Sequence, residues 1–211
     1  MKIGHLLAIG FGEAGSKIIA DNMTDGGDLD PMMPGVKTFG IFGFACIRNF
    51  MDITEVLQTD VMMFVNQIAE VTHSQVDKFG GSTNKNIGDS FLLVWKFKRM
   101  DDFNEKATGQ VHPENQIVAD LALFSFVKVI AKINNLSQIL SYRNNKALTD
   151  RMPGFTVKMG FGLHQGWAIE GAIGSFFKID ASYLSPNVNM ASRLAGATRQ
   201  YGVPLLVSGP F

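Results

Sequence analysis

The sequence lacks several features that mark common functional classes. Its 211 residues contain one cysteine, Cys46, which excludes an internal disulfide framework and fits a reducing compartment. Nineteen Lys and Arg balance nineteen Asp and Glu, so the formal net charge is 0. This balance argues against a broad basic surface that binds nucleic acid or an anionic membrane. No window reaches the roughly 18 uninterrupted apolar residues that a membrane-spanning helix needs.

Patterns typical of transition-metal sites are also missing. The four histidines are scattered through the chain without the spacing of a zinc site: His5, His73, His112 and His164. Cys46 has no histidine or second cysteine near it in sequence, so a buried, inert thiol is favoured over a nucleophile or a soft-metal ligand. In contrast, the 46% hydrophobic content, with 17 Phe and 11 Met, is sufficient for a large core and excludes general disorder.

Turn-forming residues divide the chain near Gly35. We expect residues 1–35 to form a flank or linker and residues 36–211 to form one domain. The chain ends on a strand-like segment without a polar tail, so we expect it to be a fragment of a longer protein.

Hydrophobic periodicity predicts the elements of this domain. In chain order we expect a buried strand at 36–47; a helix capped by Asp52 and Glu55 and ending near 80–81; a hairpin of strands 82–86 and 91–95; a loop at 96–113; a helix at 114–142; strands at 155–166 and 167–179; a helix between Ser185-Pro186 and Gly202; and a last strand from Val203. This order predicts an α+β fold, a mostly antiparallel sheet with helices on one face.

A glycine pattern in the flank resembles a nucleotide-binding loop. Residues 10–15 match GxGxxG, and Asp28 and Asp30 lie where a ribose-binding acid would follow. With 22 glycines in the chain such a pattern often arises by chance, and no repeated strand–helix–strand units follow it. A glycine-rich flank is therefore the favoured interpretation.

The predicted hairpin carries a first constellation of chemical groups. Asp89 follows Gly88 at the turn, where a carboxylate can meet a hard cation such as Mg²⁺. Lys85, on the same hairpin, could reach an acceptor atom of a ligand. The alternative is an ordinary surface turn, in which Asn, Gly and Asp are all common.

A second constellation lies on the last predicted helix. Asn189 and Arg193 are four residues apart and therefore project from one face, which Gly196 and Gln200 continue. The planar, permanently charged guanidinium of Arg suits phosphate oxygens. The alternative is a solvated helix face without a ligand.

Together these segments resemble the catalytic domain of class III nucleotidyl cyclases, the adenylyl and guanylyl cyclases, and especially the forms found in protists. The matching segments are 42–50, similar to the family's first metal-site strand; 85–89, similar to its second metal hairpin; 159–164; and the helix with Asn189 and Arg193. The resemblance covers 36–211. It implies a ferredoxin-like core, a head-to-tail dimer with sites at the interface, and two Mg²⁺ or Mn²⁺ ions.

The resemblance also implies residue roles and a reaction. The implied roles are Asp89 as a metal ligand, Ile47 as a metal ligand through its backbone carbonyl, Lys85 and Ser182 as the pair that reads the base, Asn189 as the ribose ligand, and Arg193 as the phosphate ligand that stabilises the transition state. Adenylyl cyclases pair Lys with Asp or Thr at the base, whereas guanylyl cyclases use Glu and Cys, so Lys85 with Ser182 favours adenine. In the implied reaction the 3′-hydroxyl attacks the α-phosphorus and pyrophosphate leaves.

Three positions depart from the family pattern. Cys46 stands where the family has its first metal Asp, and a thiol that is mostly neutral at pH 7 is a poor ligand for a hard ion. Met51 replaces a small hydroxyl residue, and Phe177 stands where related forms often carry an acid. We therefore expect this protomer to hold a metal pair badly.

These departures leave two functions open. The first is a cyclase domain that forms cAMP, in preference to cGMP, from ATP (or GTP) as one half of a dimer, weak or inactive as a homodimer but completed by another cyclase-like protomer. The alternative is a catalytically silent pseudo-cyclase with a structural or regulatory role in a larger assembly. In neither case do we expect nucleic-acid binding or membrane contact by this segment, and we expect it on the cytoplasmic side of the cell.

Overall fold

The structure, a computed structural model, describes residues 15–16, 34–98, 112–175 and 177–211. Most of the predicted flank, including Asp28, Asp30 and all but the last glycine of the GxGxxG pattern, lies outside the described residues. So does most of the loop predicted at 96–113.

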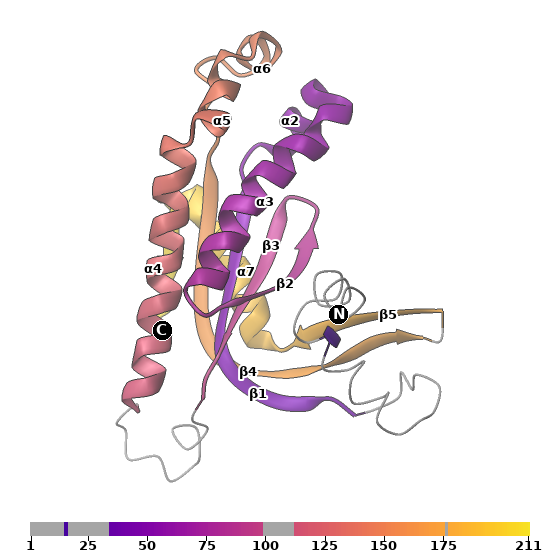
Figure 1. Ribbon diagram of the computed structural model, residues 1–211, viewed down its shortest axis with the longest axis vertical. Helices are drawn as coiled ribbons and strands as arrows, with labels where there is room; N and C mark the ends of the chain where they lie inside the picture. The colour runs from indigo at the N-terminus through magenta and orange to yellow at the C-terminus, as the bar shows by residue number, and fades with distance from the viewer. Residues whose placement is uncertain (1–14, 17–33, 99–111, 176) are drawn as a thin grey trace.

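A curled sheet forms the centre of the domain (Figure 1). Its strands are β1 (Val36–Ile47), β2 (Ser82–Ile87), β3 (Ser90–Lys96), β4 (Met159–Ser175), β5 (Lys178–Leu184) and β6 (Leu205–Val207). The strand order is β2-β3-β1-β4-β5, with antiparallel pairing throughout, and β6 adds a short parallel pairing to β4. The predicted α+β class and mostly antiparallel sheet are confirmed.

Helices cover the sheet on both faces. The helices are α2 (Phe50–Leu57), α3 (Val61–Lys78), α4 (Pro113–Asn135), α5 (Ser137–Leu140), α6 (Lys146–Arg151) and α7 (Pro186–Tyr201), with short 3-10 turns at Gln58–Asp60 and Ser141–Asn144. The helices α3 and α4 pack on one face, whereas α7 packs on the other. The expectation that all helices share one face is therefore wrong, because α7 packs against the face opposite to α3 and α4.

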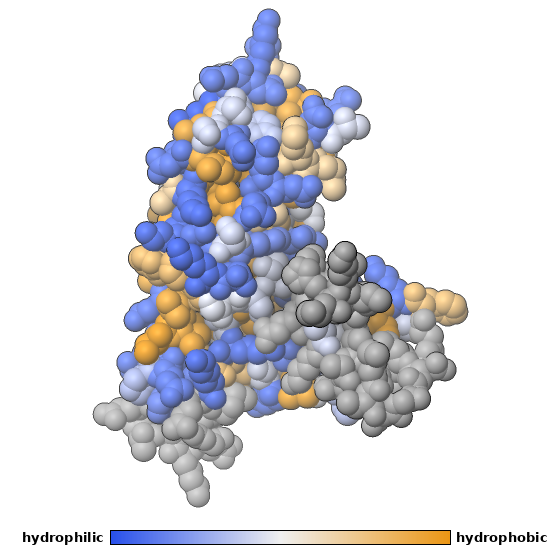
Figure 2. All heavy atoms as spheres, viewed as in Figure 1, coloured by the Kyte–Doolittle hydropathy of each residue, from blue (hydrophilic) through white to orange (hydrophobic). Residues whose placement is uncertain are grey.

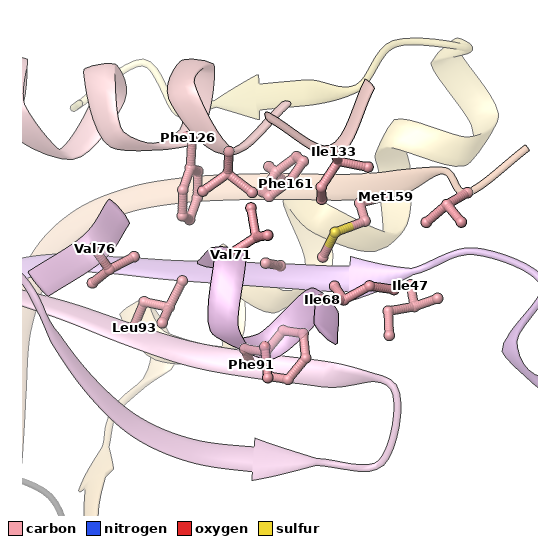
Figure 3. Close-up of a cluster of buried hydrophobic side chains, with 14 of the residues drawn as sticks. Ile47, Ile68, Val71, Val76, Phe91, Leu93, Phe126, Ile133, Met159 and Phe161 are labelled. Atoms are coloured by element: carbon pink, nitrogen blue, oxygen red, sulfur yellow. The ribbon is translucent and has the colours of Figure 1, made fainter. Parts of the chain in front are cut away.

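The alternation of side chains along β1 explains these two layers. Because successive strand residues point to opposite faces, Ile41 and Ala45 join the larger core under α3 and α4. Phe42 and Phe44 join a smaller core under α7. Figure 3 shows the larger core, where side chains of α3 and α4 meet those of the sheet strands. Residues of β1 are buried on both faces, so this strand is the centre of the fold.

The first predicted helix is two helices with a different start. The helix α2 begins at Phe50, after Asn49 in the left-handed region at φ 57°, and not at a cap formed by Asp52. The break between α2 and α3 follows from Gln58, whose φ of 48° is incompatible with a continuous helix. Asp52 and Glu55 instead contact Arg151 of α6, whose Nη2 lies 2.9 Å and 3.2 Å from their carboxylate oxygens.

Two later predictions are corrected as well. The helix predicted at 114–142 ends at Asn135, because Leu136 takes an extended backbone with ψ 121°. The two strands predicted at 155–166 and 167–179 are one long strand, β4, followed by β5. Its glycines make room for α7 rather than a turn: a β-carbon on Gly162 would collide with the backbone of Ala191.

Three predicted elements are confirmed. The first strand has the predicted bounds, and the hairpin turns at Gly88-Asp89. The helix α7 starts as expected, because Ser185 Oγ accepts hydrogen bonds from the backbone N–H groups of Asn187 and Val188 at 3.1 Å each. It ends at Gly202, which has φ 69°.

Candidate functional site

The end of β1 and the β2–β3 turn together form one part of the candidate site, here called the strand-end edge (Cys46, Ile47, Asp89 and Ser90). The backbone N–H of Ile47 donates to the carbonyl oxygen of Asp89 at 2.8 Å. Cys46 lies opposite Ser90 in the β1–β3 ladder. The predicted metal-site residues, more than 40 positions apart in sequence, are therefore brought together.

A chain of hydrogen bonds joins the side chains of this edge. Ser90 Oγ lies 2.8 Å from Asp89 Oδ1 and 3.1 Å from Cys46 Sγ. The hydroxyl of Ser90 carries one proton and lies within donating distance of both the carboxylate of Asp89 and the sulfur of Cys46. Burial raises the pKa of the Cys46 thiol and the charge of Asp89 raises it further, against an opposing effect of the Ser90 hydrogen bond. The thiol is therefore neutral at pH 7.

The donor set of the strand-end edge does not fit a pair of Mg²⁺ or Mn²⁺ ions. These ions prefer several oxygen ligands, but the edge offers one carboxylate, that of Asp89, beside a neutral thiol. Within the described ranges, no cluster of three or more His, Cys, Asp or Glu could hold a metal ion. The strand-end edge by itself therefore does not supply the carboxylates that a metal pair would need.

The predicted base-reading residues lie where the two edges of the sheet meet. Strands β2 and β5 are at opposite ends of the strand order, yet the curl of the sheet brings them together. Lys85 Nζ of β2 lies 3.6 Å from Asp180 Oδ2 of β5. The side-chain amide of Asn84 donates to the carbonyl oxygen of Ala181 at 3.4 Å. Lys85 and Ser182 are thus on two strands that contact each other.

Asp180 is a candidate residue that the sequence prediction missed. It lies two positions before Ser182 on β5, so both side chains point to the same side of the strand. The side chain of Asp180 is half exposed, whereas Ser182 is buried at 8% exposure. Period-two alternation would have paired Asp180 with Ser182, but the predicted strand ended at residue 179 and left both residues outside it.

The helix α7 presents the second pair of predicted residues to solvent. Asn189 and Arg193 are exposed, whereas Val188, Ala191 and Ala195 of the same helix are buried against the sheet. Among the described residues, neither the amide of Asn189 nor the guanidinium of Arg193 has a hydrogen bond or ion-pair partner. We call this surface the open face of α7. Both side chains are free to contact a ligand or a partner.

Three other positions of interest lie away from these groups. The guanidinium of Arg48 donates to the carbonyl oxygen of Val203 at 2.7 Å, which ties the end of β1 to the segment after α7. Met51 is 79% exposed near the start of α2. Phe177 is 99% exposed between β4 and β5, on a hairpin that projects from the body of the domain with hydrophobic side chains at its end (Figures 1 and 2).

Comparisons with known proteins agree with this geometry. A family model described as "Adenylate and Guanylate cyclase catalytic domain" matches residues 35–205. A model described as "RasGEFs all helical domain" matches only residues 1–24, most of which lie outside the described ranges. No helix in the described ranges is both long enough and apolar enough to span a bilayer.

Two curated relatives and one solved structure illustrate the similarity. The chain is 33% identical over 167 residues to "Adenylate cyclase 1" of Rhizobium meliloti (strain 1021), covering 79% of this chain and 22% of that protein. It is 25% identical over 166 residues to "Adenylate cyclase" of Anabaena cylindrica, covering 78% of this chain and 28% of that protein. A bacterial light-regulated adenylyl cyclase structure superposes with a TM-score of 0.65 at 23% identity, covering 86% of this chain and 46% of that one.

The chain thus spans less than a third of the curated relatives that it matches. The family match, in contrast, extends from the start of β1 to the start of β6 and includes every part of the candidate site. The chain belongs to the family of adenylate and guanylate cyclase catalytic domains.

Proposed function

We propose that this domain forms cAMP and pyrophosphate from ATP as one half of a dimer, in which it supplies the base, ribose and phosphate contacts and its partner supplies the metal carboxylates. One observation carries the proposal: the open face of α7 is intact and unpartnered among the described residues, whereas the strand-end edge lacks the donors for a metal pair. A chain with one complete half-site is suited to a partner with the other half.

The base contacts are proposed for the junction of β2 and β5. The ammonium group of Lys85 can donate a hydrogen bond to the base, and the carboxylate of Asp180 or the hydroxyl of Ser182 can accept one from it. Adenine offers a ring nitrogen that accepts and an amino group that donates, so it matches this pair of groups. The names of both curated relatives, which are adenylate cyclases, support the choice of ATP, although the family description covers both nucleotides.

The ribose and phosphate contacts are proposed for the open face of α7. The amide of Asn189 both donates and accepts, which suits a ribose oxygen. The guanidinium of Arg193, one helical turn further, presents a fork of N–H groups to phosphate oxygens. In the proposed reaction the 3′-oxygen bonds to the α-phosphorus as the bond to pyrophosphate breaks, and Arg193 stabilises the negative charge on the α-phosphoryl group.

The metal carboxylates are assigned to the partner protomer. We propose that Cys46 takes the place of one metal-binding Asp, since its neutral thiol is hydrogen-bonded to Ser90 and offers no charge to a hard cation. Asp89 and the carbonyl of Ile47 would be what remains of a metal site in this chain. A homodimer would then lack the same carboxylate in both of its sites.

The β4–β5 hairpin is the proposed arm that reaches the partner. Its exposed apolar side chains include Ile173, Phe177 and Leu184 at 41%, 99% and 58% exposure. Such a cluster on a projecting element is typical of a protein–protein contact. A second cyclase-like protomer in a head-to-tail arrangement is the proposed occupant.

Reconstitution tests the proposed function. The chain is purified alone and together with a cyclase-like protomer that carries two metal Asp residues, and cAMP and cGMP are measured from ATP and GTP with Mn²⁺. We expect cAMP from the mixture at a rate at least 10-fold above that of either protein alone. A mixture without activity above the partner's own rate would contradict the half-site assignment and favour a silent subunit.

A further inference from the structure

A buried histidine joins the sheet to the first turn of α7. His164 lies on β4, with 8% of its surface exposed. Its ring has hydrogen bonds at both nitrogens: Nδ1 lies 2.7 Å from Ser208 Oγ, just after β6, and Nε2 lies 3.1 Å from Asn187 Oδ1 on α7. One side chain therefore contacts two segments that are separate in sequence.

The amide of Asn187 fixes which nitrogen of the ring carries the proton. Asn187 Nδ2 donates to the carbonyl oxygen of Trp167 at 2.9 Å, so its Oδ1 faces His164. Because an amide oxygen only accepts, Nε2 of His164 is the donor. In the neutral ring Nδ1 is then an acceptor, and the hydroxyl of Ser208 donates to it.

The rest of the contact between α7 and β4 has little directionality. Buried side chains and backbone of α7 lie over glycines of β4, where no β-carbon stands between helix and strand. In the described part of the chain, the two hydrogen bonds that join α7 side chains to β4 both involve Asn187, which accepts one from His164 and donates one to Trp167. Apolar contact fixes the distance between α7 and the sheet. Hydrogen bonds are directional, so they also fix the rotation of α7 about its axis and its position along that axis.

We propose that His164 is a positioning residue: through Asn187 it holds the first turn of α7 so that Asn189 and Arg193 are presented in one fixed geometry. Asn189 follows Asn187 by two residues, and Arg193 lies one turn beyond it. Gly166 belongs to the same device, since a β-carbon there would collide with the side chain of Asn187. The proposal rests on the function proposed above, because it gives those two side chains their role.

Nuclear magnetic resonance tests the network without any cyclase assay. Long-range ¹H–¹⁵N correlations of the ring in the full chain should show a proton on Nε2 and a bare Nδ1 for His164. His164→Asn keeps an acceptor near Ser208 but loses the donor to Asn187, and it should shift the backbone amide signals of Asn189 and Arg193. Ser208→Ala should shift them less. A proton on Nδ1, or unchanged α7 signals in His164→Asn, would overturn the proposal.

Kinetics of the reconstituted complex test the consequence for catalysis. Displacing a catalytic group by about 1 Å costs roughly 10- to 100-fold in rate, so His164→Asn should lower kcat by about that factor and change KM for ATP by less than about threefold. His164→Gln, whose amide nitrogen can replace Nε2 as a donor, should recover most of the loss. Ile133→Val is the stability control, because it removes one methylene from the core on the other face of the sheet.

The outcomes separate the two proposals. If His164→Asn, His164→Gln and Ile133→Val lower activity only in proportion to the fraction of folded protein, His164 is a packing residue and the inference fails. If the wild-type complex has no cyclase activity, the proposed function fails, and the nuclear magnetic resonance experiment still decides whether His164 orients α7.

Discussion

The strand-end edge and the open face of α7 are built in opposite ways. At the strand-end edge, Ser90 Oγ lies within hydrogen-bonding distance of both Cys46 Sγ and Asp89 Oδ1. On α7, Asn189 and Arg193 project to solvent with no partner among the described residues. The side chains of the strand-end edge are therefore partly engaged with one another, whereas the exposed groups of α7 are available to a ligand or a partner. This difference is the basis of the division of roles proposed for the two protomers.

The largest expected effect comes from removing the charge of the open face. In the reconstituted complex, Arg193→Ala should lower kcat by about 10²- to 10³-fold, because it removes a donor to the charge that develops on the phosphoryl group. Arg199→Ala is the matched control, since Arg199 is also an exposed arginine of α7. Steady-state cAMP formation measures both variants. Equal activity of the two would remove Arg193 from the site.

The second-largest effect is expected from adding a carboxylate to the strand-end edge. Cys46→Asp adds a carboxylate beside Asp89 and should raise the Mn²⁺-dependent activity of the chain without its partner by about 10-fold or more, since two carboxylates can bind a metal that one holds weakly. Cys46→Ser is the control, because it changes the thiol without adding charge. Isothermal titration with Mn²⁺ reports metal binding independently of activity. An unchanged Mn²⁺ affinity in Cys46→Asp would show that the edge is not a metal site that lost one ligand.

A smaller effect is expected at the junction of β2 and β5. Lys85→Ala should raise KM for ATP by about 10-fold, because a hydrogen bond from a charged donor contributes about 1.5–3 kcal/mol. Asp180→Ala should have a similar effect if Asp180 reads the base together with Lys85, but a weaker one if Ser182 does so. Lys178→Ala, an exposed change on the same strand as Asp180, is the control. Unaltered KM in both Lys85→Ala and Asp180→Ala would place the base elsewhere.

The smallest effect concerns the support behind the strand-end edge. His73 of α3 packs edge-on against Phe91 of β3. Burial lowers the pKa of His73, against weaker raising effects from Asn86 and Glu70. The unfolded chain therefore takes up a proton near its ordinary pKa of 6.5 while the folded chain does not, so the free energy of unfolding falls as pH drops below 6.5.

Urea unfolding between pH 7.5 and 5 measures this dependence. His73→Gln should flatten the slope below pH 6.5 and leave the stability at pH 7.5 little changed. An identical slope in wild type and His73→Gln would assign the pH dependence to another group.

The sequence predicted the elements whose signals are local. The bounds of β1 follow from a run that is rich in β-branched and aromatic residues and nearly free of charge, and those of α7 from Ser185 at its cap and Gly202 at its end. The break at Gln58 was missed because a left-handed glutamine has no sequence signal. The spacing of Asp52 and Glu55 is typical of a helix start, but in the structure both carboxylates form ion pairs with Arg151.

The residues of the candidate site also differ in whether a local sequence signal could place them. Asn189 and Arg193 could be placed on one exposed face from their spacing alone, because helical periodicity is a local property. Asp180 could not be placed beside Lys85, since the curl that joins β2 to β5 is a property of the whole sheet. The bonds of His164 to Asn187 and Ser208 span 23 and 44 residues and have no local signature.

Gly162 determines how closely α7 approaches the sheet. A methyl group added there would collide with the backbone of Ala191 and push the middle of α7 away from the sheet. Arg193 would keep its charge, its exposure and its chemical identity, and only its height above the sheet would change. The height of the open face of α7 above the sheet therefore depends on the size of the residue at position 162, which lies beneath the helix.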